Sequence, residues 1–126
     1  MQPCRHSVSY SVDLRDCRLL QALSPEAVTA VFTDALITAG ATVVESISHN
    51  FPGTGLTTVL ILAESHAVLH TWPETGTVNI DIFSCSPRLK SFSAIASLGE
   101  TFGASSTSIQ EIQRADGHAG PAGIRQ

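Results

Sequence analysis

Alternating apolar and polar residues recur along this sequence in short runs of the kind that build sheets. Residues 7–14 alternate with a period of two, which predicts a strand with one buried face. Runs rich in β-branched residues follow at 41–48 and 57–63, separated by a segment with Pro and Gly at 49–55. Because β-branched side chains favour strands, we expect two strands joined by a turn-rich loop.

Three more strands are expected in the second half of the chain. They cover residues 64–72, 77–85 and 106–114, and Pro73 and Gly76 mark a turn between the first two. Side chains alternate between the two faces of a strand. In the strand 77–85, one face therefore carries Val78, Ile80 and Ile82, and the more polar face carries Asn79, Asp81, Phe83 and Cys85.

Two helices complete the expected fold. The first has Ser24 as its cap, Pro25 at its first position and Gly40 as its stop. The second is expected from Pro87 to about Gly103, with a core-facing set of Leu89, Phe92, Ile95, Leu98 and Phe102. We predict an α+β two-layer sandwich, in which a mainly antiparallel sheet carries both helices on one face and pairs with a second subunit through the other.

The length and composition indicate one compact domain. The chain has 126 residues, of which 43% are hydrophobic and 14% charged, as in a globular protein with much surface to bury. A domain this small and apolar is expected to hide part of its surface in an oligomer. We place the domain at residues 1–115 and predict a disordered tail at 116–126, which is rich in glycine and proline.

The charges argue against a nucleic acid partner, and the short apolar runs argue against a membrane. The net charge is −4, and the seven lysines and arginines are scattered, so the basic stripe that nucleic acid binding needs is missing. No apolar run is long enough to span a bilayer, and no apolar signal segment precedes the first strand. We therefore expect a cytoplasmic protein. Three cysteines without CxxC spacing predict reduced thiols.

A cluster of chemically active side chains interrupts this charge-poor sequence. It contains Glu64, Ser65, His66, His70, Glu74 and Cys85. A hydrolase-type pair of Ser65 and His70 has poor local geometry, because residues five apart on one strand point to opposite faces. A purely structural interpretation treats the histidines as ordinary sheet residues and Trp72 as part of the core.

A zinc site is the other chemical alternative. Glu64, His66, His70 and Cys85 have suitable ligand types. However, positions 66 and 70 are about 13 Å apart along a strand, so one metal could join them only after a sharp bend. We predict no metal.

The segment from Glu64 to Glu74, with Cys85 eleven residues later, closely resembles the self-cleavage segment of prokaryotic S-adenosylmethionine decarboxylases. The resemblance implies that the Ser65 hydroxyl attacks the preceding carbonyl and that the chain is cut between Glu64 and Ser65. The products would be a β chain of residues 1–64 and an α chain of residues 65–126 that begins with a pyruvoyl group. That group forms a Schiff base with the substrate amine and accepts the electrons left by carbon dioxide, as pyridoxal phosphate does.

The resemblance also implies roles for individual residues. His70 assists the proton transfers of processing, and Cys85 reprotonates the substrate carbon. Thr57 keeps a hydroxyl that supports processing. Phe51 stacks on adenine and Glu74 binds the ribose hydroxyls of S-adenosylmethionine. Each site lies between the two subunits of a homodimer of cleaved αβ protomers, and the product is the aminopropyl donor for spermidine synthesis.

Several positions depart from the family pattern. Thr57 and Thr58 stand where the family usually has serine and glycine, and Cys4, Val68 and Ser86 also differ. Because these departures lie around the pocket, a related activity stays open, namely pyruvoyl-dependent decarboxylation of a basic amino acid such as ornithine or arginine. The alternative without enzymatic activity is an uncleaved regulatory subunit.

Overall fold

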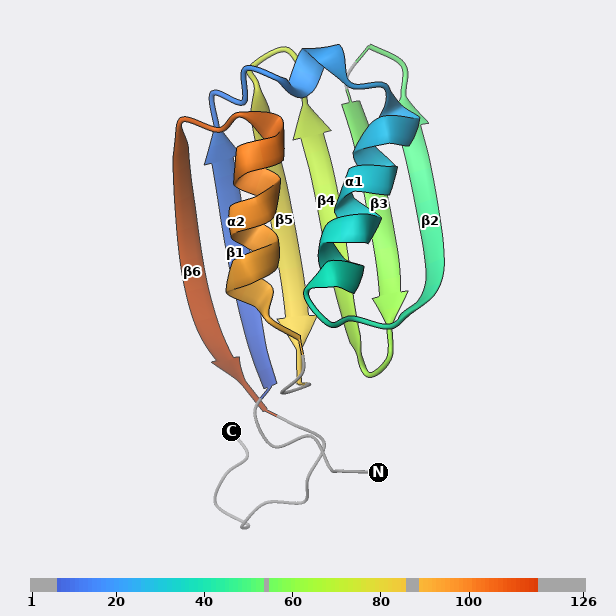
Figure 1. Cartoon of the computed structure of the whole chain (residues 1–126), viewed down its shortest axis with the longest axis vertical. Coiled ribbons are helices and arrows are strands. Elements are labelled where there is room, and N and C mark those ends of the chain that lie inside the picture. The colour runs from blue at the N-terminus through green and yellow to red at the C-terminus, as the bar shows by residue number, and fades with distance from the viewer. Residues whose placement is uncertain (1–6, 54, 86–88, 116–126) are drawn as a thin grey trace.

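The computed structural model describes residues 7–53, 55–85 and 89–115. Within these ranges it has six strands, two α-helices and one short 3₁₀ helix (Figure 1). In chain order the elements are β1 (Ser7–Arg15), η1 (Leu20–Ala22), α1 (Pro25–Thr38), β2 (Val43–Phe51), β3 (Gly55–Leu62), β4 (Ser65–Trp72), β5 (Thr77–Ser84), α2 (Ser91–Phe102) and β6 (Ser106–Arg114). The predictions for Cys4, Ser86 and the tail at 116–126 concern residues outside these ranges.

The six strands form one sheet with the order β2-β3-β4-β5-β1-β6, and every neighbouring pair is antiparallel. Both helices lie on the same face of this sheet, and the other face is not covered by any described element (Figure 1). The predicted α+β two-layer sandwich is therefore confirmed. None of the described helices is long and apolar enough to cross a membrane.

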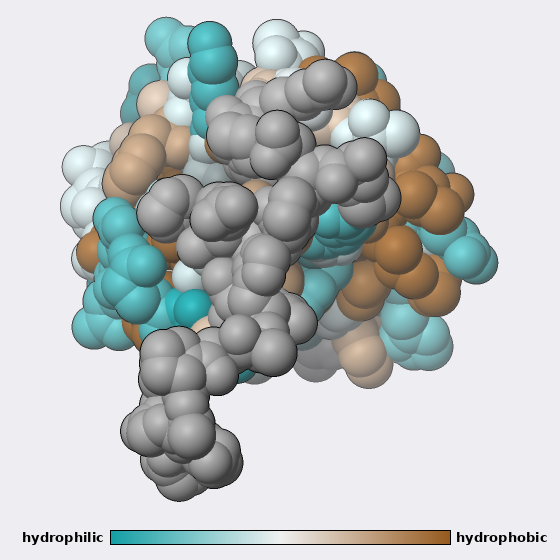
Figure 2. Space-filling view, turned by 90° about the horizontal axis from the view of Figure 1, so that it is seen from below, coloured by the Kyte–Doolittle hydropathy of each residue, from teal (hydrophilic) through white to brown (hydrophobic). Residues whose placement is uncertain are grey.

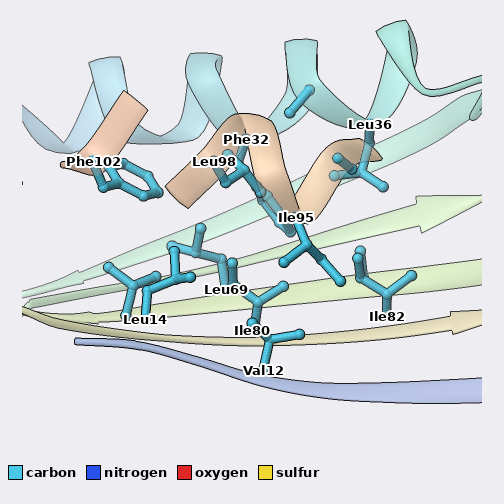
Figure 3. Packing of buried hydrophobic residues seen from close by; sticks show 14 of the residues in the cluster. Val12, Leu14, Phe32, Leu36, Leu69, Ile80, Ile82, Ile95, Leu98 and Phe102 are labelled. Carbon is cyan, nitrogen blue, oxygen red and sulfur yellow. The ribbon is translucent and has the colours of Figure 1, made fainter. Parts of the chain in front are cut away.

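The core lies between the helices and the covered face of the sheet. Phe32 and Leu36 of α1 and Leu98 of α2 point down onto apolar side chains of the central strands (Figure 3). Strands β3, β4 and β5 contribute buried residues at every second position, such as Leu69 and Ile80. Burying each such side chain stabilises the fold by about 1.5–3 kcal/mol. The period-two pattern of these three strands therefore decides which of their faces the helices cover.

Helix α1 forms as the sequence predicts. The Ser24 hydroxyl accepts a hydrogen bond from the Ala27 amide at 3.1 Å, and Pro25 occupies the first turn, where its missing amide hydrogen is not needed.

Helix α2 begins later than predicted, at Ser91 and not at Pro87. The Lys90 amide donates to the Ala39 oxygen, so this bond ties the entry of α2 to the end of α1. Phe92 was predicted to face the core but is 54% exposed, and it contacts the ring of Tyr10 at the flank of the helix. The tertiary contact therefore decides both the start of α2 and its buried face.

The hairpin between β2 and β3 is tighter than predicted. The segment 49–55 was expected to be a loop, yet β2 runs to Phe51 and pairs with Gly55 at the start of β3. Gly55 has φ of 112°, and a Cβ there would overlap the backbone oxygen of Thr71. Glycine is therefore needed for β3 to pass close to β4 at this point.

Candidate functional site

The strand β4 separates two sets of side chains. Ala67, Leu69 and Thr71 are buried under the helices, whereas His70 and Trp72 lie on the uncovered face of the sheet. Ser65 pairs with the buried Leu62 and belongs to the covered side. Ser65 and His70 thus lie on opposite faces, as their five-residue spacing predicts, and about 16 Å apart along the strand. A Ser–His pair within one chain is excluded by this geometry.

The bond between Glu64 and Ser65 lies in a tight connection between β3 and β4. Leu62 pairs with Ser65, so only Ala63 and Glu64 link the two strands. Glu64 has φ of 59°, a left-handed conformation that costs a residue with a side chain roughly 1–2 kcal/mol. The predicted cleavage position is therefore a point of backbone strain.

Two polar groups flank this strained residue. The Ser65 hydroxyl is buried and has no hydrogen-bond partner among the described residues. The Cys85 sulfur lies 3.0 Å from the backbone oxygen of Glu64. A buried hydroxyl without a partner is energetically unfavourable by about 1–3 kcal/mol, and such exceptions in native proteins call for an explanation. The arrangement thus places the Ser65 hydroxyl, a potential nucleophile, and the Cys85 sulfur near the backbone carbonyl of Glu64.

The sulfur of Cys85 is disulfide-bonded in this structure. The expectation of reduced thiols is therefore wrong for this cysteine, and any acid–base role belongs to its reduced form. Cys17 is a free thiol buried in the core, and its burial and the nearby Asp16 raise its pKa. Cys17 is thus a structural residue.

A second group of predicted residues gathers at the opposite end of β4. The Thr57 hydroxyl lies 2.7 Å from Nδ1 of His70, because the two residues face each other in the β3–β4 register. The ring of Phe51 lies 6.2 Å from the ring of His70, and Glu74 follows in the turn after β4. His70 Nε2 is buried without a hydrogen-bond partner in the described part of the chain.

The predicted site residues therefore form two half-sites in one chain. The first half-site consists of Glu64, Ser65 and Cys85, at the end of the sheet where β3 turns into β4. The second half-site consists of Phe51, Thr57, His70 and Glu74, at the end where β4 turns into β5. Ser65 and His70 are about 16 Å apart along β4, so one chain does not bring all of these residues together.

The uncovered sheet face exposes several large apolar side chains. Ile47 is 55% exposed, and Ile61 and Trp72 are each 40% exposed. Hydrophobic surface gathers on the side of the molecule that carries β2 and β3 (Figure 2). Trp72 does not belong to the core, contrary to the purely structural interpretation. Exposed apolar patches of this kind mark interaction surfaces.

Sequence reasoning missed two polar residues beside the second half-site. Trp72 Nε1 donates to Oδ1 of Asn79 at 2.6 Å, and Asn79 Nδ2 donates to Oδ1 of Asp13 at 2.7 Å. The alternation of residues 77–85 places Asn79 on the correct face. No local pattern could pair it with Asp13, which is 66 residues away.

Comparisons with known proteins converge on one family. The family model described as S-adenosylmethionine decarboxylase matches residues 8–115. A relative from Pelotomaculum thermopropionicum, named S-adenosylmethionine decarboxylase proenzyme, is 35% identical over 89 residues, which are 71% of each chain. A relative of the same name from Prochlorococcus marinus is 33% identical over 103 residues, or 82% of each chain.

The fold also matches a solved structure. The crystal structure of the adenosylmethionine decarboxylase from Aquifex aeolicus superposes with a TM-score of 0.74 and is 23% identical in sequence. The match covers 92% of this chain and 98% of that chain. The two proteins therefore share their fold over almost their whole lengths.

Proposed function

Because this chain belongs to the S-adenosylmethionine decarboxylase family, we propose that it decarboxylates S-adenosylmethionine with a pyruvoyl group made from its own Ser65. The family membership supports the substrate and the reaction. The observation that supports Ser65 as the origin of the group is its buried hydroxyl, which has no hydrogen-bond partner among the described residues and follows the left-handed Glu64. These residues fit the precursor of a pyruvoyl group.

Self-cleavage would proceed through the backbone of this connection. The Ser65 Oγ attacks the carbonyl carbon of Glu64, and the amide nitrogen leaves, so that an ester replaces the peptide bond. Loss of the Cα proton of Ser65 expels the Glu64 carboxylate as residues 1–64. Water then replaces the nitrogen at residue 65, ammonia leaves, and residues 65–126 begin with a pyruvoyl group. The backbone strain at Glu64 favours cleavage of the Glu64–Ser65 bond, because cleavage releases that strain.

The pyruvoyl carbonyl supplies an electron sink when formed. In its reduced form, the Cys85 thiol lies close enough to this position to act as the acid that returns a proton to the substrate carbon. A thiol can serve as a general acid because its proton can be transferred to a carbon base. His70, held by Thr57, assists the proton transfers of processing.

The complete site is proposed to form between two copies of the chain. If two uncovered sheet faces pack against each other in opposite directions, the end of the sheet that carries Glu64 and Cys85 in one protomer lies toward the second half-site of the other. The Glu64–Ser65 bond is at that end. The separation of the half-sites and the exposed Ile47, Ile61 and Trp72 support this homodimer of cleaved αβ protomers. Phe51 would then meet the adenine and the sulfonium cation, and Glu74 the ribose hydroxyls. Three further points stay predictions. They are the domain boundary at residues 1–115, the cytoplasmic location and the use of the product as an aminopropyl donor for spermidine synthesis.

The denatured intact mass of the purified protein tests the cofactor, measured with and without a carbonyl-trapping amine. We expect two fragments that match residues 1–64 and 65–126, and an amine adduct on the second alone. Ser65→Ala should give one uncut chain, whereas Ser93→Ala, on the exposed side of α2, should be cut like the wild type. A single unmodified wild-type chain after long incubation would contradict self-processing and favour a regulatory subunit.

Release of carbon dioxide from competing substrates tests the activity. The cleaved protein should act on S-adenosylmethionine and not on ornithine or arginine. Reaction with the basic amino acids alone would leave the cofactor in place and overturn the assigned substrate.

A further inference from the structure

A chain of side-chain hydrogen bonds crosses the uncovered face of the sheet from β4 to β1. The indole of Trp72 donates to the amide oxygen of Asn79 on β5 at 2.6 Å, and the amide nitrogen of Asn79 donates to the carboxylate of Asp13 on β1 at 2.7 Å. Arg15 Nη2 lies 3.5 Å from the other oxygen of Asp13. Three strands are thus joined by one relay, which we call the Trp72–Asn79–Asp13 relay.

The chemistry of the three groups allows only one orientation of the amide. An indole N–H can only donate, and an ionised carboxylate can only accept. The oxygen of Asn79 must therefore face Trp72, and its nitrogen must face Asp13. Since both ends are engaged, Asn79 cannot turn without losing two hydrogen bonds, and the ring of Trp72 is held with it.

The held ring of Trp72 packs directly against His70. The two ring centroids are 4.4 Å apart with an interplanar angle of 65°. Asn79 is also the direct cross-strand partner of His70 in the β4–β5 register. On its other side, the imidazole is held by the 2.7 Å contact between Nδ1 and the Thr57 hydroxyl. His70 is thus clamped between β3 on one side and the relay on the other.

This clamp explains how Nε2 of His70 can be buried without a hydrogen-bond partner among the residues that the structure describes. The ring cannot rotate to find a partner, because Thr57 fixes Nδ1 and Trp72 occupies the space beside it. Such support by surrounding side chains is what holds reactive groups in their working geometry.

We propose that Trp72 and Asn79 are positioning residues for His70, anchored by Asp13, and that they hold the imidazole in the orientation that self-cleavage needs. The inference rests on the proposed function for the role of His70, and on the hydrogen bonds alone for the orientation of its ring.

The test removes the relay and then rebuilds it with the charges exchanged. Asn79→Leu removes both hydrogen bonds at nearly constant size. Asn79→Asp keeps an acceptor for the indole but places a second carboxylate against Asp13. The double variant with Asp13→Asn and Asn79→Asp restores a donor facing an acceptor at every step and leaves the net charge as in the wild type. Ser11→Ala is the matched control, because it removes a 3.0 Å bond between β1 and Asp81 on the same face.

Three quantities are measured for every variant, namely the NMR resonances of the Trp72 and His70 rings, the rate of self-cleavage and the resistance to urea. Trp72 is the only tryptophan of the chain, so a single indole N–H resonance reports its hydrogen bond, and cross-relaxation to the His70 ring reports the packing. The second readout is the rate constant of self-cleavage from the intact mass. We expect Asn79→Leu and Asn79→Asp to shift the indole resonance, weaken the cross-relaxation and slow cleavage about 10-fold. The double variant should return the cleavage rate to within about twofold of the wild type. The cleavage rate of Ser11→Ala should also stay within about twofold of the wild type.

Three outcomes would overturn the proposal. One is an unchanged cleavage rate in Asn79→Leu after its indole bond is lost. Another is a double variant that regains the indole resonance and wild-type resistance to urea but still cleaves slowly, and a third is equal slowing in Ser11→Ala. If the wild type itself is never cut, the proposed function fails. The positioning is then judged separately, and unchanged His70 ring resonances in Asn79→Leu would refute it.

Discussion

The sulfur of Cys85 lies 3.0 Å from the backbone oxygen of Glu64, although the two residues belong to different connections of the sheet. Glu64 is held in a left-handed conformation at this contact, and the hydroxyl of the next residue, Ser65, has no hydrogen-bond partner in the described part of the chain. One sulfur is therefore close to the carbonyl that the proposed attack would reach and to the position that the pyruvoyl group would occupy. Under the proposed function, this geometry would let Cys85 act near the same position in processing and in catalysis.

Cys85→Ser should separate these two roles. The serine hydroxyl can still donate to the Glu64 oxygen, so self-cleavage should persist. A hydroxyl is a much weaker acid than a thiol, so carbon dioxide release should fall by about 10²-fold or more. Both quantities are measured with a thiol reductant present, by intact mass and by trapped carbon dioxide. Cys17→Ala is the control and should keep turnover within about twofold. Unchanged turnover in Cys85→Ser would remove Cys85 from the acid role.

Glu64→Gly should stabilise the uncut chain. In a Ser65→Ala background, which prevents cleavage, the free energy of unfolding should rise by about 0.5–1 kcal/mol. Glycine removes the left-handed penalty of roughly 1–2 kcal/mol, and its greater freedom in the unfolded state offsets part of this gain. Urea unfolding measures the change. Ala30→Gly, on the exposed side of α1, should instead lower the free energy of unfolding by about 1 kcal/mol. A loss of stability in Glu64→Gly would mean that this residue is not strained.

Thr57→Val should slow self-cleavage, because it removes the 2.7 Å contact with His70 Nδ1 while keeping the shape of the side chain. We expect a decrease of about 10-fold or more in the rate constant, followed by intact mass. Thr57→Ser keeps the hydroxyl and should cleave at a rate close to that of the wild type. Thr33→Val removes a comparable hydroxyl contact inside α1 and should have no effect on cleavage. Equal rates for Thr57→Val and Thr57→Ser would show that the hydroxyl is not needed.

Phe51→Ala should weaken substrate binding and leave cleavage intact. The side chain is 40% exposed beside the second half-site, and a cation on an aromatic ring contributes about 0.5–2 kcal/mol. The KM for S-adenosylmethionine should therefore rise about 10-fold, and Phe51→Tyr should restore it. Ile37→Ala, exposed on α1, serves as the control because it lies on the helical layer. An unchanged KM in Phe51→Ala would place the adenine elsewhere.

The sequence predicted several elements closely because their signals are local. The strand at 106–114 has the predicted bounds, and α1 has its predicted cap at Ser24. The errors occur where a distant contact decides the outcome. Helix α2 starts at Ser91, where the Lys90 amide meets Ala39, and β2 extends to Phe51 because β3 continues to pair with it. A segment with glycine and proline indicates a turn, but the extent of pairing between β2 and β3 decides how long that turn is.

The sequence alone determined the α+β class and the placement of Ser65 and His70 on opposite faces, because side-chain alternation is a property of any extended backbone. Family membership was also readable from the residues between Glu64 and Cys85, and the comparisons confirm it. Only the tertiary structure decided that β1 inserts between β5 and β6. That placement brings Asp13 to Asn79, and the ends of β3 and β5 bring Glu64 to Cys85. Such contacts depend on the register between strands far apart in the chain, and no local pattern encodes that register.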